Sequence, residues 1–375
     1  MQRRSFLTQF LLASFGLALI GCSDAPTTKT PDANLGSAAA PGSSDSAKRI
    51  IILTNGNAPF WDAAVAGAKD AEKELKCEAG NLSVTVDRGD FAAETQINKL
   101  RQYGNATDVV GVGISVTDSN NEAIVDEMKK LQAAGIKVVT IDSDVDRSKN
   151  SDARFAYLGT DNSKAGQQLG KAAKGIMESA NYAAFVGLKG AANAQERVGG
   201  FQQAAGDTFK QLDYLGDAPE GPDKARSNVR DALDRNKDLN LLVGIWSYNT
   251  PAIIDIVTQL KLREKTKIVG FDADPPAIDG MQAGMVDAMI VQNPYQMGYQ
   301  GVRVLKALVE KDDATVKEMF PKHGEPGGEI YDTGLKLVVP DEGSPLKAEM
   351  FDTNTQFLKL GEFKAWLQKY NLTGS

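Results

Sequence analysis

The chain of 375 residues carries 42 basic and 49 acidic side chains, which give a formal net charge of -7 at neutral pH. A nucleic-acid-binding protein needs a basic face, so this balance argues against a nucleic-acid partner. One histidine and two cysteines are too few for a metal site rich in His or Cys. The length is sufficient for two domains of ordinary size.

The N-terminus has the layout of a secretory signal. A charged start at residues 1–4 precedes an apolar run at 10–20 that is too short to span a bilayer. The run ends in Leu19-Ile20-Gly21-Cys22, which resembles the lipobox of bacterial lipoproteins. That resemblance implies that residues 1–21 are a signal peptide, removed before Cys22, and that the Cys22 thiol is diacylated.

Residues 22–48 are predicted to form a lipidated flexible tether. They are rich in Ser, Thr, Ala, Pro, Gly and Asp, and too poor in large apolar side chains to fold by burial. With Cys22 modified, Cys77 is the remaining thiol, so no intrachain disulfide is expected. The pair Arg3-Arg4 also resembles a twin-arginine signal, which leaves both the twin-arginine and the general export route open.

Short apolar strands alternate with helices from residue 49 onward. The run 50–53 is typical of a buried parallel strand, and residues 60–75 place apolar side chains at helical spacing. The alternation continues with strands at 82–86, 109–114 and 137–141 and helices at 92–103 and 120–134. Repeated β-α units of this kind predict a doubly wound parallel sheet.

A second series of the same kind follows the first. Its strands are predicted at 155–158, 183–186, 212–215, 241–245, 268–271 and 288–291, and its helices at 163–179, 195–210, 224–235, 251–261, 276–283 and 295–310. Two such series predict an α/β protein with two Rossmann-like lobes. An amphipathic helix is predicted at 351–370 in the tail.

The turns that follow the strands carry the candidate binding residues, because open parallel sheets bind ligands beyond the carboxyl ends of their strands. These turns combine aromatic rings, carboxylates, one arginine and amides. A sugar suits this mixture, since its C–H face packs on rings and its hydroxyls both donate and accept hydrogen bonds. A phosphate site would need a glycine-rich turn or several basic groups. The candidates are Asn57, Phe60, Trp61, Asp142, Arg197, Trp246, Tyr248, Asn249, Asp272 and Gln292.

Several candidates have a purely structural alternative. Phe60 and Trp61 fit the apolar stripe of the first helix and could be core residues. Arg197 could pair with a surface acid, and Gln292 could satisfy buried backbone groups.

The carboxylates come in pairs, which could also indicate catalysis. Asp142 with Asp144, or Asp272 with Asp274, could form the acid pair of a glycosidase. The second member of each pair could instead cap the following helix, and the first is interpreted as a ligand contact. No G-x-S-x-G elbow is present, and His323 lies in a stretch typical of a solvated loop. We therefore expect no enzyme, no cofactor and no metal.

These turns resemble those of periplasmic sugar-binding proteins of the ribose-binding type, which serve ABC importers. The likeness covers about residues 49–308 and rests on five motifs in chain order. They are Asn57-Ala58-Pro59-Phe60-Trp61, Ile141-Asp142, a helix start at 195–201 that keeps Arg197, Val269-Gly270-Phe271-Asp272, and Ile290-Val291-Gln292. The resemblance implies that aromatic rings sandwich a sugar, while Asn57, Asp142, Arg197, Asp272 and Gln292 bind its hydroxyls.

Three positions depart from the family pattern. Ser143 stands where the family has an arginine, and Tyr248-Asn249 stands in place of an Asn-Asp turn. The aromatic residue expected near Gly221 is absent, a role that Trp246 or Tyr248 could fill.

The resemblance also implies a hinged arrangement of type I periplasmic binding proteins, with crossovers near Tyr157, Gln292 and Gly328. The predicted N-terminal lobe is 49–156 plus 293–328, the C-terminal lobe is 157–292 plus 329–340, and 341–375 is an extension.

The expected function is that of a monomeric, lipid-anchored, extracytoplasmic protein that captures a sugar and delivers it to an ABC permease. Two alternatives remain open at this stage. One is a sensor that presents its sugar to a membrane receptor or kinase, and the other is a secreted glycosidase.

Overall fold

The computed structural model describes residues 47–58, 60–218 and 221–375. The predicted signal peptide, Cys22 and all but the end of the predicted tether lie outside these residues. No helix in the part of the chain that the structure describes combines the length and apolar character needed to cross a bilayer.

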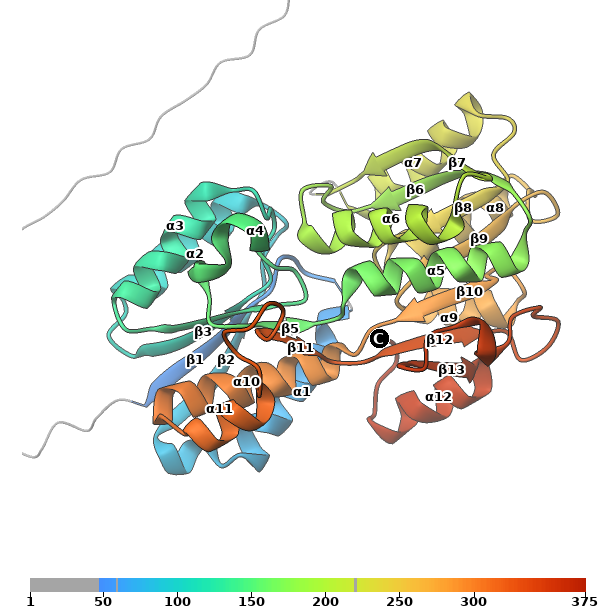
Figure 1. The fold of residues 1–375 in the computed structure, drawn as a ribbon. Coiled ribbons are helices and arrows are strands. Elements are labelled where there is room, and N and C mark those ends of the chain that lie inside the picture. Colours follow the sequence, from blue (N-terminus) through green and yellow to red (C-terminus); the bar gives the residue numbers. More distant parts are fainter. Residues whose placement is uncertain (1–46, 59, 219–220) are drawn as a thin grey trace, which may run out of the picture. The chain divides into compact units, whose positions relative to one another are not determined.

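The first sheet contains six strands, all of them parallel. They are β1 (Lys48–Leu53), β2 (Leu82–Asp87), β3 (Val109–Ile114), β4 (Lys137–Ile141), β5 (Tyr157–Gly159) and β11 (Ile330–Asp332), in the order β11-β5-β4-β3-β1-β2. The helices of this lobe are α1 (Phe60–Glu74), α2 (Ala93–Asn105), α3 (Glu122–Ala133), α10 (Pro294–Glu310), and the short α4 (Arg147–Asn150) and α11 (Asp313–Met319). Figure 1 shows α10 beside α1, although the two helices are more than 200 residues apart in the sequence.

The alternation of side chains along each strand explains why both faces are covered. In β1, Ile50 and Ile52 pack with the apolar faces of α1 and α10, whereas Ile51 and Leu53 pack with those of α2 and α3. A strand that is apolar on both sides therefore needs a helix layer on each side, as the continuous run at 50–53 predicts.

The second sheet has seven strands in the described part of the chain; β10 and β12 pair antiparallel, so β12 and β13 run opposite to the other five. Its strands are β6 (Ala180–Val186), β7 (Phe209–Gly216), β8 (Leu241–Gly244), β9 (Lys267–Phe271), β10 (Ala288–Val291), β12 (Leu335–Val339) and β13 (Thr355–Lys359). Helices α5 (Asn162–Ile176) and α6 (Ala192–Ala205) pack on one face, and α7 (Pro222–Arg235), α8 (Asn249–Gln259), α9 (Pro275–Gln282) and α12 (Leu360–Lys369) on the other. The predicted two-lobed α/β fold is confirmed.

The chain passes between the two sheets three times, as predicted. The crossings follow β5, β10 and β11, so they lie at 160–161, 292–293 and 333–334. The predicted lobe boundaries at 157 and 329 need correction, because β5 continues the parallel ladder of β4 and β11 pairs with β5. Both short strands therefore belong to the first sheet rather than to the second lobe.

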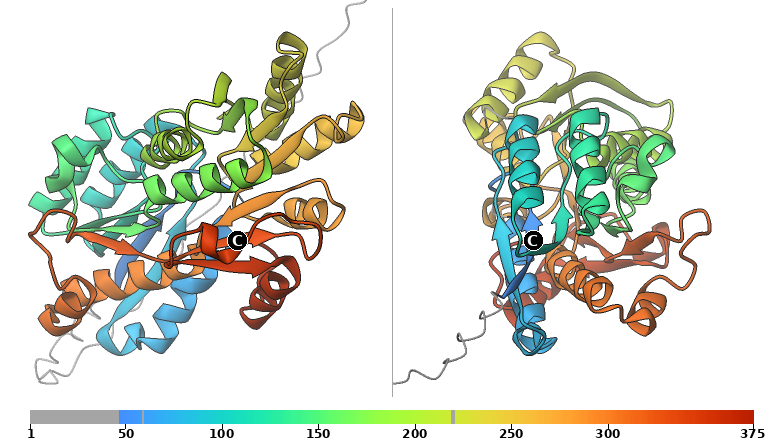
Figure 2. Two further views of the ribbon diagram at one scale, coloured as in Figure 1. Left: turned by 45° about the vertical axis from the view of Figure 1, so that its right-hand side comes forward. Right: turned by 90° about the vertical axis from the view of Figure 1, so that its left-hand side faces the viewer.

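The tail after residue 341 differs from its prediction. The helix expected over 351–370 is a strand, β13, followed by a shorter helix, α12. The strand forms because β12 presents an unpaired edge on which residues 355–359 add in parallel register. Figure 2 shows this red segment packed onto the second sheet, so it is an integral part of that lobe.

Helices α5 and α6 approach closely because glycines replace side chains at their contact. A Cβ atom at Gly166 would lie 2.2 Å from the carbonyl oxygen of Arg197, and one at Gly200 would lie 2.2 Å from that of Ser163. Such a distance excludes any side chain unless the helices separate. The contact therefore fixes the position of α6, which carries Arg197.

Replacing Gly200 by Ala should reveal this contact. We expect the free energy of unfolding to fall by about 1–3 kcal/mol, the usual cost of overpacking a tight interior. The neighbouring Gly199 is the matched control, because a Cβ atom there meets nothing within 4 Å; Gly199→Ala should be neutral or stabilising by up to about 1 kcal/mol. Urea unfolding of both variants measures the difference, and equal effects would contradict the close helix contact.

Candidate functional site

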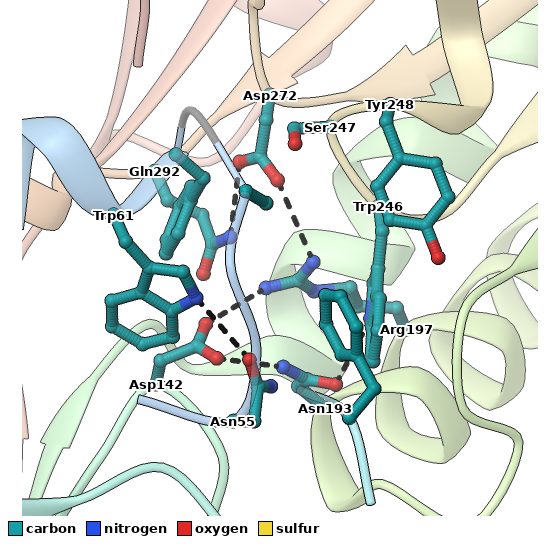
Figure 3. A pocket seen from close by; sticks show the side chains of 13 residues that line it. Asn55, Trp61, Asp142, Asn193, Arg197, Trp246, Ser247, Tyr248, Asp272 and Gln292 are labelled. Carbon is teal, nitrogen blue, oxygen red and sulfur yellow. Dashed lines mark hydrogen bonds and ion pairs between the residues drawn. The ribbon is translucent and has the colours of Figure 1, made fainter. Parts of the chain in front are cut away.

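A pocket lies where the carboxyl ends of the two sheets face each other. The first lobe contributes Asn55, Ala58, Phe60, Trp61, Phe91 and Asp142, and the second contributes Asn193, Arg197, Trp246, Ser247, Tyr248, Asp272 and Gln292. Figure 3 shows Trp61 on one side of the pocket, Trp246 and Tyr248 on the other, and Arg197 between them.

The two carboxylates of the pocket are presented by the same backbone device. Asp142 directly follows β4 and Asp272 directly follows β9, and both have left-handed φ angles, of 63° and 62°. Aspartate tolerates this conformation better than most residues. The backbone N–H of Asp142 donates to Leu158 at 3.0 Å, and that of Asp272 donates to Ile290 at 2.7 Å. Each turn therefore ends its strand at a fixed point and leaves a carboxylate in the pocket.

Neutral donors surround both carboxylates. Asp142 accepts hydrogen bonds from the Ser115 hydroxyl and from the Asn193 amide, each at 3.1 Å. Asp272 accepts one from the Gln292 amide at 3.0 Å. Because Asn193 lies in the first turn of α6 in the second lobe, its bond to Asp142 connects the two lobes directly (Figure 3).

Arg197 is the cation between the carboxylates and is buried to 1% exposure. Its Nε donates to Asn162 at 2.9 Å and its Nη1 donates to the carbonyl of Ile245 at 3.0 Å. The ion-pair distances are longer, at 3.8 Å to Asp142 and 3.9 Å to Asp272. Among the described residues Nη2 has no hydrogen-bond partner, although it is fully buried.

The indole rings of the pocket are held by matching amides. Trp61 donates to the Asn55 side chain, and Trp246 donates to that of Asn193, both at 3.2 Å. The ring of Phe91 lies 5.8 Å from that of Trp246 and so joins the two lobes by a ring contact. A Cβ atom at Gly187 would lie 2.1 Å from the Trp246 ring, so this ring needs a glycine beneath it.

A small hydrogen-bond network holds Trp246 and Tyr248, the two aromatic residues that the second lobe contributes to the pocket. The Tyr248 hydroxyl donates to Asp217, and the Asn249 amide donates to the other oxygen of that carboxylate at 2.8 Å. The Asn249 oxygen accepts from the backbone N–H of Trp246 at 3.0 Å. Asn249 therefore acts through Trp246 and Tyr248 rather than lining the pocket.

The structure brings together eight of the ten residues predicted for the site. They are Phe60, Trp61, Asp142, Arg197, Trp246, Tyr248, Asp272 and Gln292. Asn57 and Asn249 do not line the pocket. Asn57 is exposed and accepts a hydrogen bond from Arg88 at 3.1 Å, because the turn after β1 directs it outward and directs Asn55 inward.

Four polar or aromatic lining residues were missed, and each had a signal in the sequence. Asn55 lies two residues before the predicted site residue Asn57. Ser247 lies between two predicted site residues, Trp246 and Tyr248. Asn193 precedes the predicted helix start at 195–201 by two residues. Phe91 follows β2, so the same rule about strand ends would have found it.

The second aspartate of each Asp-x-Asp pair lies outside the pocket. Asp144 is buried, and although burial acts to raise its pKa, hydrogen bonds and charge from Arg154, with Arg147 nearby, hold that pKa below its usual value. Asp274 occupies the N-cap position of α9 without a capping hydrogen bond from its side chain. Asp144 is not a cap, because Asp146 holds the N-cap position of α4, whereas Asp274 holds that position in α9 without the capping bond. Neither pair places two carboxylates in the pocket.

Metal ligands do not gather in the described part of the chain, where no group of three or more His, Cys, Asp or Glu side chains is positioned to hold an ion. His323 is exposed and stacks on the Phe155 ring, with its Nε2 atom 3.0 Å from the Phe155 carbonyl oxygen. It does not line the pocket.

Burial dominates the electrostatics of the two pocket carboxylates. It raises the pKa of Asp142, and it raises the pKa of Asp272 to about 7, while the positive charge of Arg197 acts in the opposite direction on both. One guanidinium is thus the counter-charge of two carboxylates. An anionic ligand would add a further uncompensated charge, so the pocket suits an uncharged molecule with hydroxyl groups.

Comparison with known proteins identifies the class. Residues 49–313 match the model of the periplasmic binding protein domain, and the chain belongs to that family. The ribose import binding protein RbsB of Escherichia coli (strain K12) is 25% identical over 298 residues, which cover 77% of this chain and 89% of that protein. The D-allose-binding periplasmic protein of the same strain is 25% identical over 278 residues, 69% of this chain and 83% of that one. The resemblance to the ribose-binding type is confirmed.

Solved structures agree with the sequence relatives. GanP, a glucose-galactose binding protein from Geobacillus stearothermophilus, matches with a TM-score of 0.66 and 26% identity, over 78% of this chain and 97% of that one. An ABC transporter solute-binding protein from Agrobacterium vitis with bound D-fucose matches with a TM-score of 0.67 and 25% identity, over 78% and 95% of the two chains.

The titration of Asp272 should appear in the stability of the sugar-free protein. Its pKa of about 7 lies above the ordinary value of 3.8, so its contribution to stability is present at low pH and is lost as the pH rises through 7. We expect the unfolding free energy of the parent minus that of Asp272→Asn to fall steadily as the pH rises from 3.8 to about 7. Urea unfolding at a series of pH values measures it. Asp126→Asn, on the exposed face of α3, is the control; a difference for Asp272→Asn that does not change with pH would refute the assignment.

Proposed function

We propose that this protein binds an uncharged monosaccharide in the pocket between its lobes and delivers it to an ABC import permease. The observation that carries the proposal is a pair of buried polar atoms that lack partners among the described residues. They are Nη2 of Arg197, a donor, and Oε1 of Gln292, an acceptor. Leaving such atoms unpaired is costly, and a sugar hydroxyl can both accept from the first and donate to the second.

The aromatic rings support a sugar rather than another polar molecule. Trp61 comes from the first lobe and Trp246 from the second, and each indole N–H is already bonded to an asparagine. The rings therefore offer apolar faces, which suit the C–H face of a sugar ring. The carboxylates and the guanidinium can then serve its hydroxyls.

We expect the lobes to close on a ligand, because residues of both lobes line the pocket. Asp142 belongs to the first lobe and Arg197 to the second, so one ligand that touches both favours the closed arrangement. The three crossings provide the hinge about which two such lobes would move. Free protein would open to admit the sugar, and the bound form would be the one that the permease recognises.

Binding without chemistry is the better supported role. A glycosidase needs two carboxylates placed across the scissile bond, with one of them able to protonate the leaving group. Here the two pocket carboxylates, Asp142 and Asp272, flank the Arg197 guanidinium at 3.8 and 3.9 Å, so a protein cation lies between them. The relatives described above are named as binding proteins.

A thermal-shift panel tests the function directly, since a ligand that binds the folded state raises Tm by mass action. The panel consists of D-ribose, D-allose, D-glucose, D-galactose and D-fucose, with D-ribose 5-phosphate as the anionic control. We expect at least one neutral sugar to raise Tm and the phosphate ester to have no effect. Absence of any shift with every neutral sugar, at millimolar concentration, would overturn the proposal.

Arg197→Gln should weaken binding of the stabilising sugar by about 1.5–3 kcal/mol, the scale of hydrogen bonds to a charged group. That corresponds to roughly a 10- to 150-fold larger Kd by titration calorimetry. Arg230→Gln, on the exposed side of α7, is the matched control and should bind as the parent does. Unchanged affinity in Arg197→Gln, with folding verified by circular dichroism, would remove Arg197 from the site.

We further propose that the protein is an extracytoplasmic monomer held at the membrane by lipid on Cys22. The lipobox and the family both support export, and the composition of residues 22–48 supports a tether. In cells, Cys22→Ser should yield protein without diacyl mass and without partition into detergent, as judged by intact-mass spectrometry and phase separation. Cys77→Ser is the control, because that thiol is buried in the first lobe and should leave lipidation intact. Equal lipidation of both variants would exclude Cys22.

A further inference from the structure

The end of the chain lies directly behind the sugar-binding turn of the second lobe. After α12 the backbone returns toward β9 and β10, and the mark at the C-terminus in Figure 1 lies beside these strands. Ser375 is buried to 1% exposure, whereas the nearby Thr373 is exposed. A buried polar residue at this place requires partners.

Those partners are the pocket turn and the second crossing between lobes. The N–H of Ser375 donates to the carbonyl of Ala273 at 3.1 Å, and the N–H of Ala273 donates to a main-chain oxygen of Ser375 at 2.6 Å. The Ser375 hydroxyl donates to the carbonyl of Gln292 at 3.1 Å. Ser375 thus bonds directly to the backbone of the pocket residue Gln292. It also bonds to Ala273, the residue that directly follows the pocket residue Asp272.

The equivalent turn of the first lobe shows what the tail replaces. There Ser143 follows Asp142, and its N–H donates to Ile141 at 2.7 Å while its carbonyl accepts from Val116 at 3.1 Å. The end of β4 and the loop after β3 thus satisfy that turn. In the second lobe the corresponding N–H and carbonyl belong to Ala273, which is fully buried, and the tail supplies the partner of each.

The close packing of Gly374 also shows that the tail lies against the Asp272 turn. A Cβ atom at Gly374 would lie 2.7 Å from the carbonyl oxygen of Ala273 and 3.1 Å from Cδ of Pro275. The tail backbone therefore lies against the turn with no room for a side chain. It excludes water from the back of the turn that carries Asp272.

We propose that residues 374–375 are positioning residues for the sugar site, which hold the Asp272 turn and Gln292 in their binding geometry. They lie outside the stretch at 49–313 that matches the family model. The inference rests on the role of Asp272 and Gln292 in sugar binding proposed above. Its test uses the sugar-free protein, so that failure of one proposal can be told from failure of the other.

The experiment compares four variants: deletion of residues 374–375, Gly374→Val, Ser375→Ala and the control Thr373→Ala. Two measurements are made without sugar, hydrogen exchange of the Ala273 amide and the ¹³C titration of the Asp272 carboxyl. In the deletion we expect the Ala273 amide to exchange about tenfold faster or more, from the loss of one buried hydrogen bond. As water reaches the turn, the Asp272 midpoint should move down from about 7.

The remaining variants separate positioning from a general loss of stability. Gly374→Val should reproduce the deletion without removing any residue. Ser375→Ala keeps the main-chain bonds, so the Ala273 amide should stay protected, and Thr373→Ala should change neither measurement. The amide of Ser143 is the internal reference and should exchange as in the parent throughout. A folded deletion or Gly374→Val protein with unchanged Ala273 exchange and unchanged Asp272 titration would overturn the proposal.

Discussion

The buried guanidinium of Arg197 is the constraint on which the rest of the site depends. It is the cation shared by two carboxylates, one from each lobe, at 3.8 and 3.9 Å. Its direct hydrogen bonds go to neutral groups of the second lobe, so the carboxylates remain incompletely compensated and burial raises the pKa of both. Under the function proposed above, a site in this state stabilises a ligand that brings hydroxyl groups and no charge and that contacts both lobes.

The two lobes position their pocket residues by the same two local features. Each sheet ends a strand with an aspartate in the left-handed conformation, and each lobe supports an indole ring with an asparagine. The two copies differ in what stabilises the aspartate turn from behind. In the first lobe the neighbouring loop after β3 contributes a donor, whereas in the second lobe the tail returns to supply one. The extension after residue 341 thereby connects to the site through Ser375 and Ala273 rather than forming a separate appendage.

Most of the site could be predicted because open parallel sheets place their functional residues at a known edge. That rule selected Asp142, Asp272 and Arg197, which the structure places in the pocket, and it applied equally to Phe91, which was overlooked. It could not decide which residue of a turn faces inward. In the turn after β1 the difference between Asn55 and Asn57 is a matter of backbone direction over two residues, and composition favours neither.

The sequence by itself determined the α/β alternation, the two lobes and the chemical character of the pocket, because these follow from local hydrophobic periodicity and from residues adjacent to strands. The tertiary structure decided the rest: the short strands β5 and β11, the replacement of a predicted helix by β13, and the burial of Ser375 against Ala273. Each of these depends on pairing with a strand edge or turn that is distant in the chain. A local pattern contains no information about whether such an unpaired edge is available, and so the outcome is set by the assembled sheet.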